Sequence, residues 1–213
     1  ARVPVCVMLD HGEDLDYVRK ALDLGFSAVM YDGSSLAYEE NVAMTREVVA
    51  MAKACNADVE AEIGIVTGHE GKTFAINDVS DAYTDPELAA RYVKDTGIDA
   101  LAASVGTVHG FYATKPKLDF DRISEIAETI STPLVLHGGS GLSDSDFRTA
   151  VERGISKVNI FTDINQAGAR AAGSGYREGI GLTDMILPEI EAVKRSVMEK
   201  MRLFGSAGHG SGR

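Results

Sequence analysis

Cysteine is scarce in this chain of 213 residues, which contains only Cys6 and Cys55. Neither has a second cysteine at the short spacing of a redox or zinc motif, so the thiols indicate neither kind of site. Sparse, unpaired cysteines are typical of a reducing compartment, and we expect a cytoplasmic protein with reduced thiols.

The sequence also lacks long apolar runs and basic clusters. No segment approaches the roughly 18 apolar residues of a membrane span, and "ARVPVCVMLDHG" is unlike a signal peptide because its apolar part leads directly into charge. Lys and Arg number 21 against 32 Asp and Glu, giving a formal net charge of -11. This charge argues against a nucleic acid or an anionic membrane as partner and favours a small molecule.

What is present fits one globular domain over residues 1–213, since 45% of the residues are hydrophobic and 25% are charged. Short apolar runs predict six strands, at 3–9, 27–32, 58–64, 99–106, 132–138 and 156–161. Helical patterns lie between them, and a long amphipathic helix is expected at about 182–204, followed by a flexible tail at 205–213.

Apolar strands separated by single helices indicate a parallel sheet covered by helices, hence an α/β fold. Composition and periodicity leave two architectures open, a (β/α)8 barrel and a doubly wound sheet. Both bring the carboxyl ends of all strands to one face, so residues far apart in the sequence can form a common site there.

Each predicted strand ends in polar side chains capable of chemistry. These strand-end residues are Asp10, His11, Asp32, Glu62, His109, His137, Asn159 and Asp163. Three histidines at equivalent positions suit a catalytic zinc ion with one open coordination position. Asp32 and Glu62 could hold a displaced or second cation, orient the histidines, or simply cap the helices that follow.

Asp10 and His11 are adjacent, and on an ideal strand their side chains would point to opposite faces. Both can reach one site only where the strand breaks into its loop, which Gly12 permits.

In "VHG" (108–110) and "HGGSG" (137–141), a histidine is followed by glycine, which leaves backbone N–H groups uncovered. Successive uncovered N–H groups beside a helix start form a nest for an oxyanion, although "GGSG" alone is more typical of a plain loop. "NIFTD" (159–163) offers a second set of donors that includes Thr162. Phosphate is the expected guest, and backbone amides can bind it even in an acidic protein.

Six blocks together resemble the class II, zinc-dependent ketose-bisphosphate aldolases. They are "LDHG" (9–12), "MYDGSSLAYEENVAMT" (30–45), "VEAEIG" (59–64), "DALAASVGTVHGFY" (99–112), "PLVLHGGSGL" (133–142) and "KVNIFTDI" (157–164). The resemblance covers nearly the whole chain and is nearest to the shorter, tagatose-type branch. It implies a (β/α)8 barrel of which about six βα units are present here, so we expect about 70 further N-terminal residues in the full protein.

The resemblance also implies roles for individual residues. His11, His109 and His137 would bind zinc, Asp10 would be the acid/base at the aldehyde oxygen, and Glu70 would remove the carbon-bound proton. Asp32 and Glu62 match an alternative metal position. The implied substrate contacts are Gly110, Gly138, Gly139, Ser140, Asn159, Ile160, Phe161 and Thr162.

The implied activity is reversible aldol cleavage of a ketose 1,6-bisphosphate, tagatose or fructose, to dihydroxyacetone phosphate and glyceraldehyde 3-phosphate. This is a reaction of carbohydrate metabolism and glycolysis. The family also implies a homodimer or homotetramer and, near the phosphate, an additional monovalent cation.

Two positions depart from the family pattern: Met8 replaces a usual histidine, and the 65–78 loop differs around His69 and Glu70. Two other functions stay open at this point, a metal-dependent sugar-phosphate isomerase or epimerase and a non-catalytic aldolase-like partner subunit.

Overall fold

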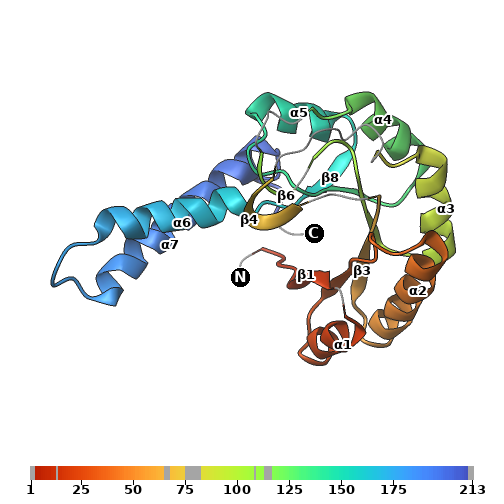
Figure 1. The fold of residues 1–213 in the computed structure, drawn as a ribbon, viewed down its shortest axis with the longest axis horizontal. Coiled ribbons are helices and arrows are strands. Elements are labelled where there is room, and N and C mark those ends of the chain that lie inside the picture. The colour runs from red at the N-terminus through yellow and green to blue at the C-terminus, as the bar shows by residue number, and fades with distance from the viewer. Residues whose placement is uncertain are drawn as a thin grey trace.

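A computed structural model describes residues 3–12, 14–64, 68–74, 83–107, 109–112 and 117–210 of the chain. For 68–74 and 109–112 it describes the backbone alone. Figure 1 shows one rounded body of strands and helices with a long helical arm extending from it.

The body is built on a six-stranded sheet in which each adjacent pair of strands is parallel, with the order β1-β2-β3-β5-β7-β8. This confirms the predicted α/β architecture as a parallel, partial barrel. The strands are β1 (Met8–Gly12), β2 (Ala28–Tyr31), β3 (Asp58–Ile63), β5 (Ala100–Ala103), β7 (Leu134–Leu136) and β8 (Ile155–Val158).

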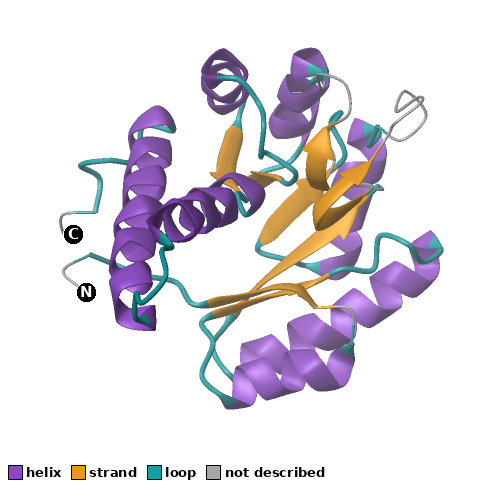
Figure 2. Cartoon of the chain, turned by 60° about the vertical axis from the view of Figure 1, so that its left-hand side comes forward, coloured by secondary structure: helices purple, strands orange, loops and turns teal. Residues whose placement is uncertain are grey.

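Helices cover the outer side of this sheet (Figures 1 and 2). They are α1 (Leu15–Asp23), α2 (Tyr38–Ala54), α3 (Pro86–Thr96), α4 (Phe120–Thr129) and α5 (Asp144–Glu152). Local chemistry sets their ends. Asp85 caps α3 just before Pro86, Gly97 ends α3 in the left-handed region at φ 70°, and Ser143 with Asp146 forms a capping box on α5.

The strand side chains divide between two cores because successive residues point to opposite faces of a sheet. A large core between sheet and helices includes Val29, Val59, Leu101 and Leu136. Among the described residues, the inner face carries a small apolar cluster of Met30, Ala102 and Val135, with Met8 and Ala100 packed against it. The remaining inner positions are therefore available for polar groups.

The described strands are shorter than several predicted ones, and the structure differs most from the prediction at the start of β1 and around β4 and β6. Residues 3–7 precede β1, which starts at Met8. The 65–78 segment, expected as a loop, contains β4 (Gly68–Phe74), which pairs in parallel with β6 (His109–Tyr112) in a separate two-stranded sheet. His109 thus begins a strand of its own, β6, and does not lie directly at the carboxyl end of β5.

The arm is a pair of packed helices, α6 (Thr162–Gly175) and α7 (Leu182–Leu203), at the left of Figure 1. The sequence predicted α7 with nearly these bounds but only the start of α6. After α7, residues 205–210 form turns, and Ser206 N–H donates to the carbonyl of Met201. Within the described ranges, no helix is long and apolar enough to cross a membrane.

Candidate metal centre and active site

The end of β1 brings the adjacent side chains of Asp10 and His11 close to His137. His11 has a φ of 49°, a left-handed conformation that is uncommon for a side-chain-bearing residue. A Cβ on Gly12 would lie 2.8 Å from the carbonyl oxygen of Met30. The unusual backbone conformation thus lies at His11 itself, while Gly12, expected to permit the break, allows the close approach of β2.

A carboxylate orients His11. Its Nδ1 lies 2.8 Å from Oδ2 of Asp32, the residue that follows β2, and Asp32 also accepts hydrogen bonds from the N–H and hydroxyl of Ser34. Burial alone would lower the pKa of His11, but the hydrogen bond to Asp32 and the charges of Asp10, Glu62 and Asp32 raise it to about 9. Burial would raise the pKa of Asp32, and its hydrogen bonds to His11 and Ser34 instead bring it below the usual range.

His137 directly follows β7 and is completely buried. Its Nδ1 faces Nε2 of His11 at 3.0 Å, and its Nε2 lies 2.8 Å from Oε1 of Glu60. Burial lowers the pKa of His137, and the hydrogen bond and charge of Glu60 oppose that shift without cancelling it. The facing rings therefore differ in basicity: His11 carries the proton more readily, and His137 tends to be neutral.

Two groups of side chains within the described residues could each hold a metal ion. One is Asp10, His11 and His137, and the other is His11, Asp32 and Glu62. The two histidines of the first set fit zinc well. Tetrahedral zinc with nitrogen ligands at 2.0–2.1 Å holds them about 3.3 Å apart, close to the 3.0 Å between the facing nitrogens. Each ring is also anchored through its other nitrogen by a carboxylate, the usual support of a metal-binding histidine.

Glu62 lies beside the His11–His137 pair. Its side chain is 1% exposed, and its Oε2 lies 3.9 Å from Nδ1 of His137. Asn41 on α2 donates a hydrogen bond to the backbone carbonyl of Glu62, which holds the end of β3. Glu62 and Asp32 thus converge on the site from neighbouring strands, as their strand-end positions predicted.

Two polar residues that sequence reasoning did not place in the site lie directly beneath it. Glu60 is 3% exposed and pairs with Lys157 at 2.9 Å between Oε2 and Nζ. Lys157 also donates to Oδ1 of Asn159 at 2.6 Å, and the Asn159 amide donates to Oδ1 of Asp10 at 2.9 Å. The sequence does contain a signal for Glu60 and Lys157. Each is a charged residue inside a predicted strand, two positions before a recognised site residue, so both members of each pair lie on the same face of the strand.

The "HGGSG" loop leads from His137 to the start of α5. Gly138 and Gly141 have φ values of 65° and 86°, and Ser140 is buried. A Cβ on Gly139 would meet Ile160, Phe147 and Val158 at 3.0–3.2 Å, so at this position the missing side chain serves close packing. The loop therefore combines turns and tight packing, the conformation in which backbone N–H groups can face a ligand.

The second donor segment lies at the start of α6, next to this loop. Thr162 is buried, and Asp163 N–H approaches Oγ of Ser140 at 3.4 Å. Phe161, by contrast, is half exposed. The structure thus brings the "HGGSG" and "NIFTD" segments together.

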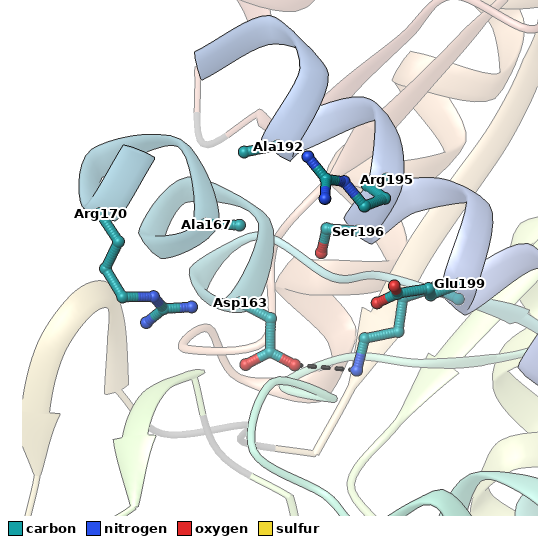
Figure 3. Close-up of a pocket in the computed structure, with 8 residues that line it drawn as sticks. Asp163, Ala167, Arg170, Ala192, Arg195, Ser196 and Glu199 are labelled. Atoms are coloured by element: carbon teal, nitrogen blue, oxygen red, sulfur yellow. Dashed lines mark hydrogen bonds and ion pairs between the residues drawn. The ribbon is translucent and has the colours of Figure 1, made fainter. Parts of the chain in front are cut away.

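A separate pocket lies where α6 packs on α7 (Figure 3). Its charged residues are Asp163, Arg170, Arg195, Glu199 and Lys200. Lys200 pairs with Asp163 at 2.9 Å, and its ammonium lies 4.7 Å above the ring of Phe147. Lys200 on α7 therefore contacts both α5, through Phe147, and the first turn of α6, which carries part of the candidate phosphate site.

Some of the predicted site residues lie outside the described side chains. These are the third histidine, His109, its neighbour Gly110, and Glu70, for which only the backbone of β6 and β4 is described. Their proposed contacts with metal and substrate stay predictions.

Parallel strands covered by helices, with histidines and carboxylates gathered at the strand ends, define an α/β barrel-type enzyme with a candidate metal centre. The family model "Fructose-bisphosphate aldolase class-II" matches residues 1–209. The chain belongs to this family, which makes it a lyase of the aldolase type.

Relatives agree with this assignment. The chain is 42% identical to the 6-phospho-5-dehydro-2-deoxy-D-gluconate aldolase of Halalkalibacterium halodurans, over 97% of this chain and 71% of the relative. It is 40% identical to the fructose-bisphosphate aldolase of Geobacillus stearothermophilus, over 97% of this chain and 72% of the relative. Among solved structures, the YdjI aldolase from Escherichia coli K12 matches with a TM-score of 0.86 and 36% identity. The match covers 99% of this chain and 73% of the YdjI chain.

Proposed function

We propose that this protein catalyses reversible, zinc-dependent aldol cleavage of a phosphorylated ketose, releasing dihydroxyacetone phosphate. The observation that carries the proposal is the pair of facing nitrogens, Nε2 of His11 and Nδ1 of His137, each on a ring anchored by a carboxylate. The position of Asp10 beside them, held by Asn159, supports the same reaction.

His11 and His137 would hold the zinc ion, with His109 as the proposed third ligand. A zinc ion there supplies Lewis-acid polarisation of the substrate carbonyl, an effect worth several kcal/mol. Because His11 has a raised pKa, the protein must release its proton before that nitrogen can bind the metal.

The chain's own groups would perform the proton transfers and the positioning. Asp10 exchanges a proton with the hydroxyl at the bond that forms or breaks, and its hydrogen bond to Asn159 fixes the carboxylate in place. Glu70 is the proposed base for the carbon-bound proton. The "HGGSG" loop and the start of α6 would bind the phosphate, so that metal and phosphate fix the two ends of a small substrate.

The substrate class follows from what the relatives' names have in common. Fructose 1,6-bisphosphate and 6-phospho-5-dehydro-2-deoxy-D-gluconate both contain a ketone adjacent to a phosphorylated CH2 group, and aldol cleavage of either releases dihydroxyacetone phosphate. They differ at the far end, which carries a phosphate in the first and a carboxylate in the second. We therefore propose two candidate substrates, a ketose 1,6-bisphosphate (fructose or tagatose) and the keto-deoxy-gluconate phosphate.

The decisive experiment supplies each candidate to the zinc-loaded protein and measures dihydroxyacetone phosphate with a coupled dehydrogenase. We expect release from at least one substrate, loss of activity with a chelator, and recovery when zinc is added. Activity that survives chelation would contradict the metal mechanism. Interconversion of ketoses without triose release would identify an isomerase or epimerase instead.

We further propose that the active form is a cytoplasmic homodimer or homotetramer. Exposed apolar side chains on α7, among them Leu182, Leu187 and Ile190, support this assembly. Sedimentation of the purified protein tests it, and a monomer over the assay concentrations would contradict it.

A further inference from the structure

We propose that Glu60 and Lys157 are positioning residues: together they orient the metal-binding face of His137 and the amide that holds Asp10. This inference rests on the proposed function. It goes beyond it by assigning a role to two residues, on β3 and β8, that contact neither substrate nor metal in the proposed mechanism.

The first step concerns the tautomer of His137. An ionised carboxylate can only accept hydrogen bonds, so Nε2 of His137, 2.8 Å from Oε1 of Glu60, must carry the hydrogen. The lone pair then belongs to Nδ1, the nitrogen that faces His11. Glu60 thereby selects which nitrogen of His137 is available to a metal.

The second step concerns the amide of Asn159. Lys157 has donors only, so its 2.6 Å contact identifies the Asn159 atom it meets as the oxygen. The NH2 group then points toward Asp10 at 2.9 Å. The 3.2 Å approach of this NH2 group to Nε2 of His137 is a contact between two donors, since Glu60 already fixes the hydrogen on that nitrogen.

The third step is that one ion pair, Glu60–Lys157, connects the tautomer of His137 with the orientation of the Asn159 amide. Lys157 Nζ bridges Oε2 of Glu60 at 2.9 Å and Oδ1 of Asn159. Glu60 is 3% exposed and the Lys157 side chain 38% exposed, so the pair is shielded from water mainly on the carboxylate side. A candidate metal ligand and a candidate acid/base are therefore set by the same two side chains.

A purely structural ion pair is the competing explanation. Replacing a buried pair with apolar side chains is often neutral or stabilising, so burial alone gives no reason to keep this one. The adjoining inner layer is apolar, formed by Met30, Ala102 and Val135, which shows that this interior accepts such side chains. The two explanations differ in what each variant should change.

Glu60→Gln tests the first role, with Glu39→Gln, the same substitution at an exposed carboxylate of α2, as matched control. We expect Glu60→Gln to weaken Co2+ affinity about 10- to 100-fold and to change the visible absorption of the bound cobalt, because the ligand ring is no longer fixed. Glu39→Gln should match the unmodified protein in both. Unchanged affinity and spectrum in Glu60→Gln would overturn the role of Glu60.

Lys157→Met tests the second role. Glu60 would still accept from His137, so Co2+ affinity should hold, while kcat should fall about 10- to 100-fold because Asn159 loses its orienting donor. Lys157→Arg, which retains donors and charge, should recover part of kcat. Full activity in Lys157→Met would overturn the role of Lys157. A loss of kcat that is fully explained by a lower metal content would overturn it as well.

Imidazole nitrogen NMR of the metal-free protein provides a readout independent of metal and turnover. We expect Nε2 of His137 to be protonated in the unmodified protein and the tautomer to become mixed in Glu60→Gln. If the unmodified protein shows this tautomer but binds no Co2+, the proposed function fails and the Glu60 orientation stands. If it binds Co2+ and His137 is protonated on Nδ1, the inference fails and the proposed function stands.

Discussion

The strand ends and the helical arm use apolar residues in opposite ways. Strand residues such as Val29, Leu101 and Leu136 are completely buried, and they hold charged groups against one another just beyond the sheet. The arm helix α7, described along its whole length, has no buried residue and exposes Leu182 by 72% and Leu187 by 61%. Both regions are regular in secondary structure, yet only the first encloses its apolar side chains.

This difference shows where the molecule can hold a site. Buried charges need partners with fixed geometry, and the packed strands supply it for His11, His137 and Glu60. The arm has mainly the contacts between α6 and α7, among them the Lys200–Asp163 pair, and Lys200 also lies above the ring of Phe147 on α5. Perturbing the strand ends should therefore affect metal and chemistry, and perturbing the exposed face of α7 should affect neither strongly.

The largest effect is expected from His137→Ala, which removes a candidate metal ligand from the buried centre. Retained zinc should fall to background after dialysis, and aldol cleavage should be lost, because the remaining groups no longer enclose the ion. Metal analysis and the coupled assay measure the two effects. His209→Ala, at an exposed histidine beyond α7, is the control, and normal activity in His137→Ala would refute the ligand assignment.

Leu136→Ala tests the packing immediately before that histidine. Leu136 is completely buried on β7, and truncating such a side chain typically costs about 2–5 kcal/mol of unfolding free energy. Denaturant unfolding followed by circular dichroism measures the loss. A cost within error of zero would show that the sheet does not supply the rigidity attributed to it.

pH dependence tests the charges around His11. Its pKa of about 9 in the folded chain exceeds the ordinary 6.5, so folding favours the protonated ring. The resulting stability is fully present below pH 6.5 and is lost as pH rises through 9. Asp10, Asp32, Glu62 and His137 surround the ring.

Metal-free protein should therefore lose on the order of 1–2 kcal/mol between pH 7 and about pH 10, since one pKa unit is worth about 1.4 kcal/mol and partial exposure weakens the effect. Denaturant unfolding in chelator measures it, with His11→Asn as control. Equal slopes for the two proteins would contradict the raised pKa.

The smallest effect is expected on the arm. In protein dilute enough to be monomeric, Leu187→Ala removes a side chain that is already 61% exposed, so the unfolding free energy should change by no more than about 0.5 kcal/mol and zinc content should not change. The same unfolding and metal measurements apply. A loss comparable to that of Leu136→Ala in the monomer would contradict the exposure of Leu187.

Strand alternation and strand-end position were enough to predict much of the site. They identified His11, Asp32, Glu62 and His137, which the structure brings together, because parallel strands align their carboxyl ends whatever the loops do. They did not identify Glu60 and Lys157, whose role depends on register between strands distant in the sequence. They named Gly12 as the residue that permits the break in β1, and did not foresee that His11 itself adopts the unusual backbone conformation.

The sequence by itself determined the α/β class, the capped helices and the set of side chains at the strand ends, because these follow from local periodicity and capping. Only the tertiary structure decided which nitrogen of each ring faces its neighbour, which carboxylate supports which histidine, and that one lysine connects two of these groups. Such pairings depend on distances between strands, and local sequence patterns do not specify them.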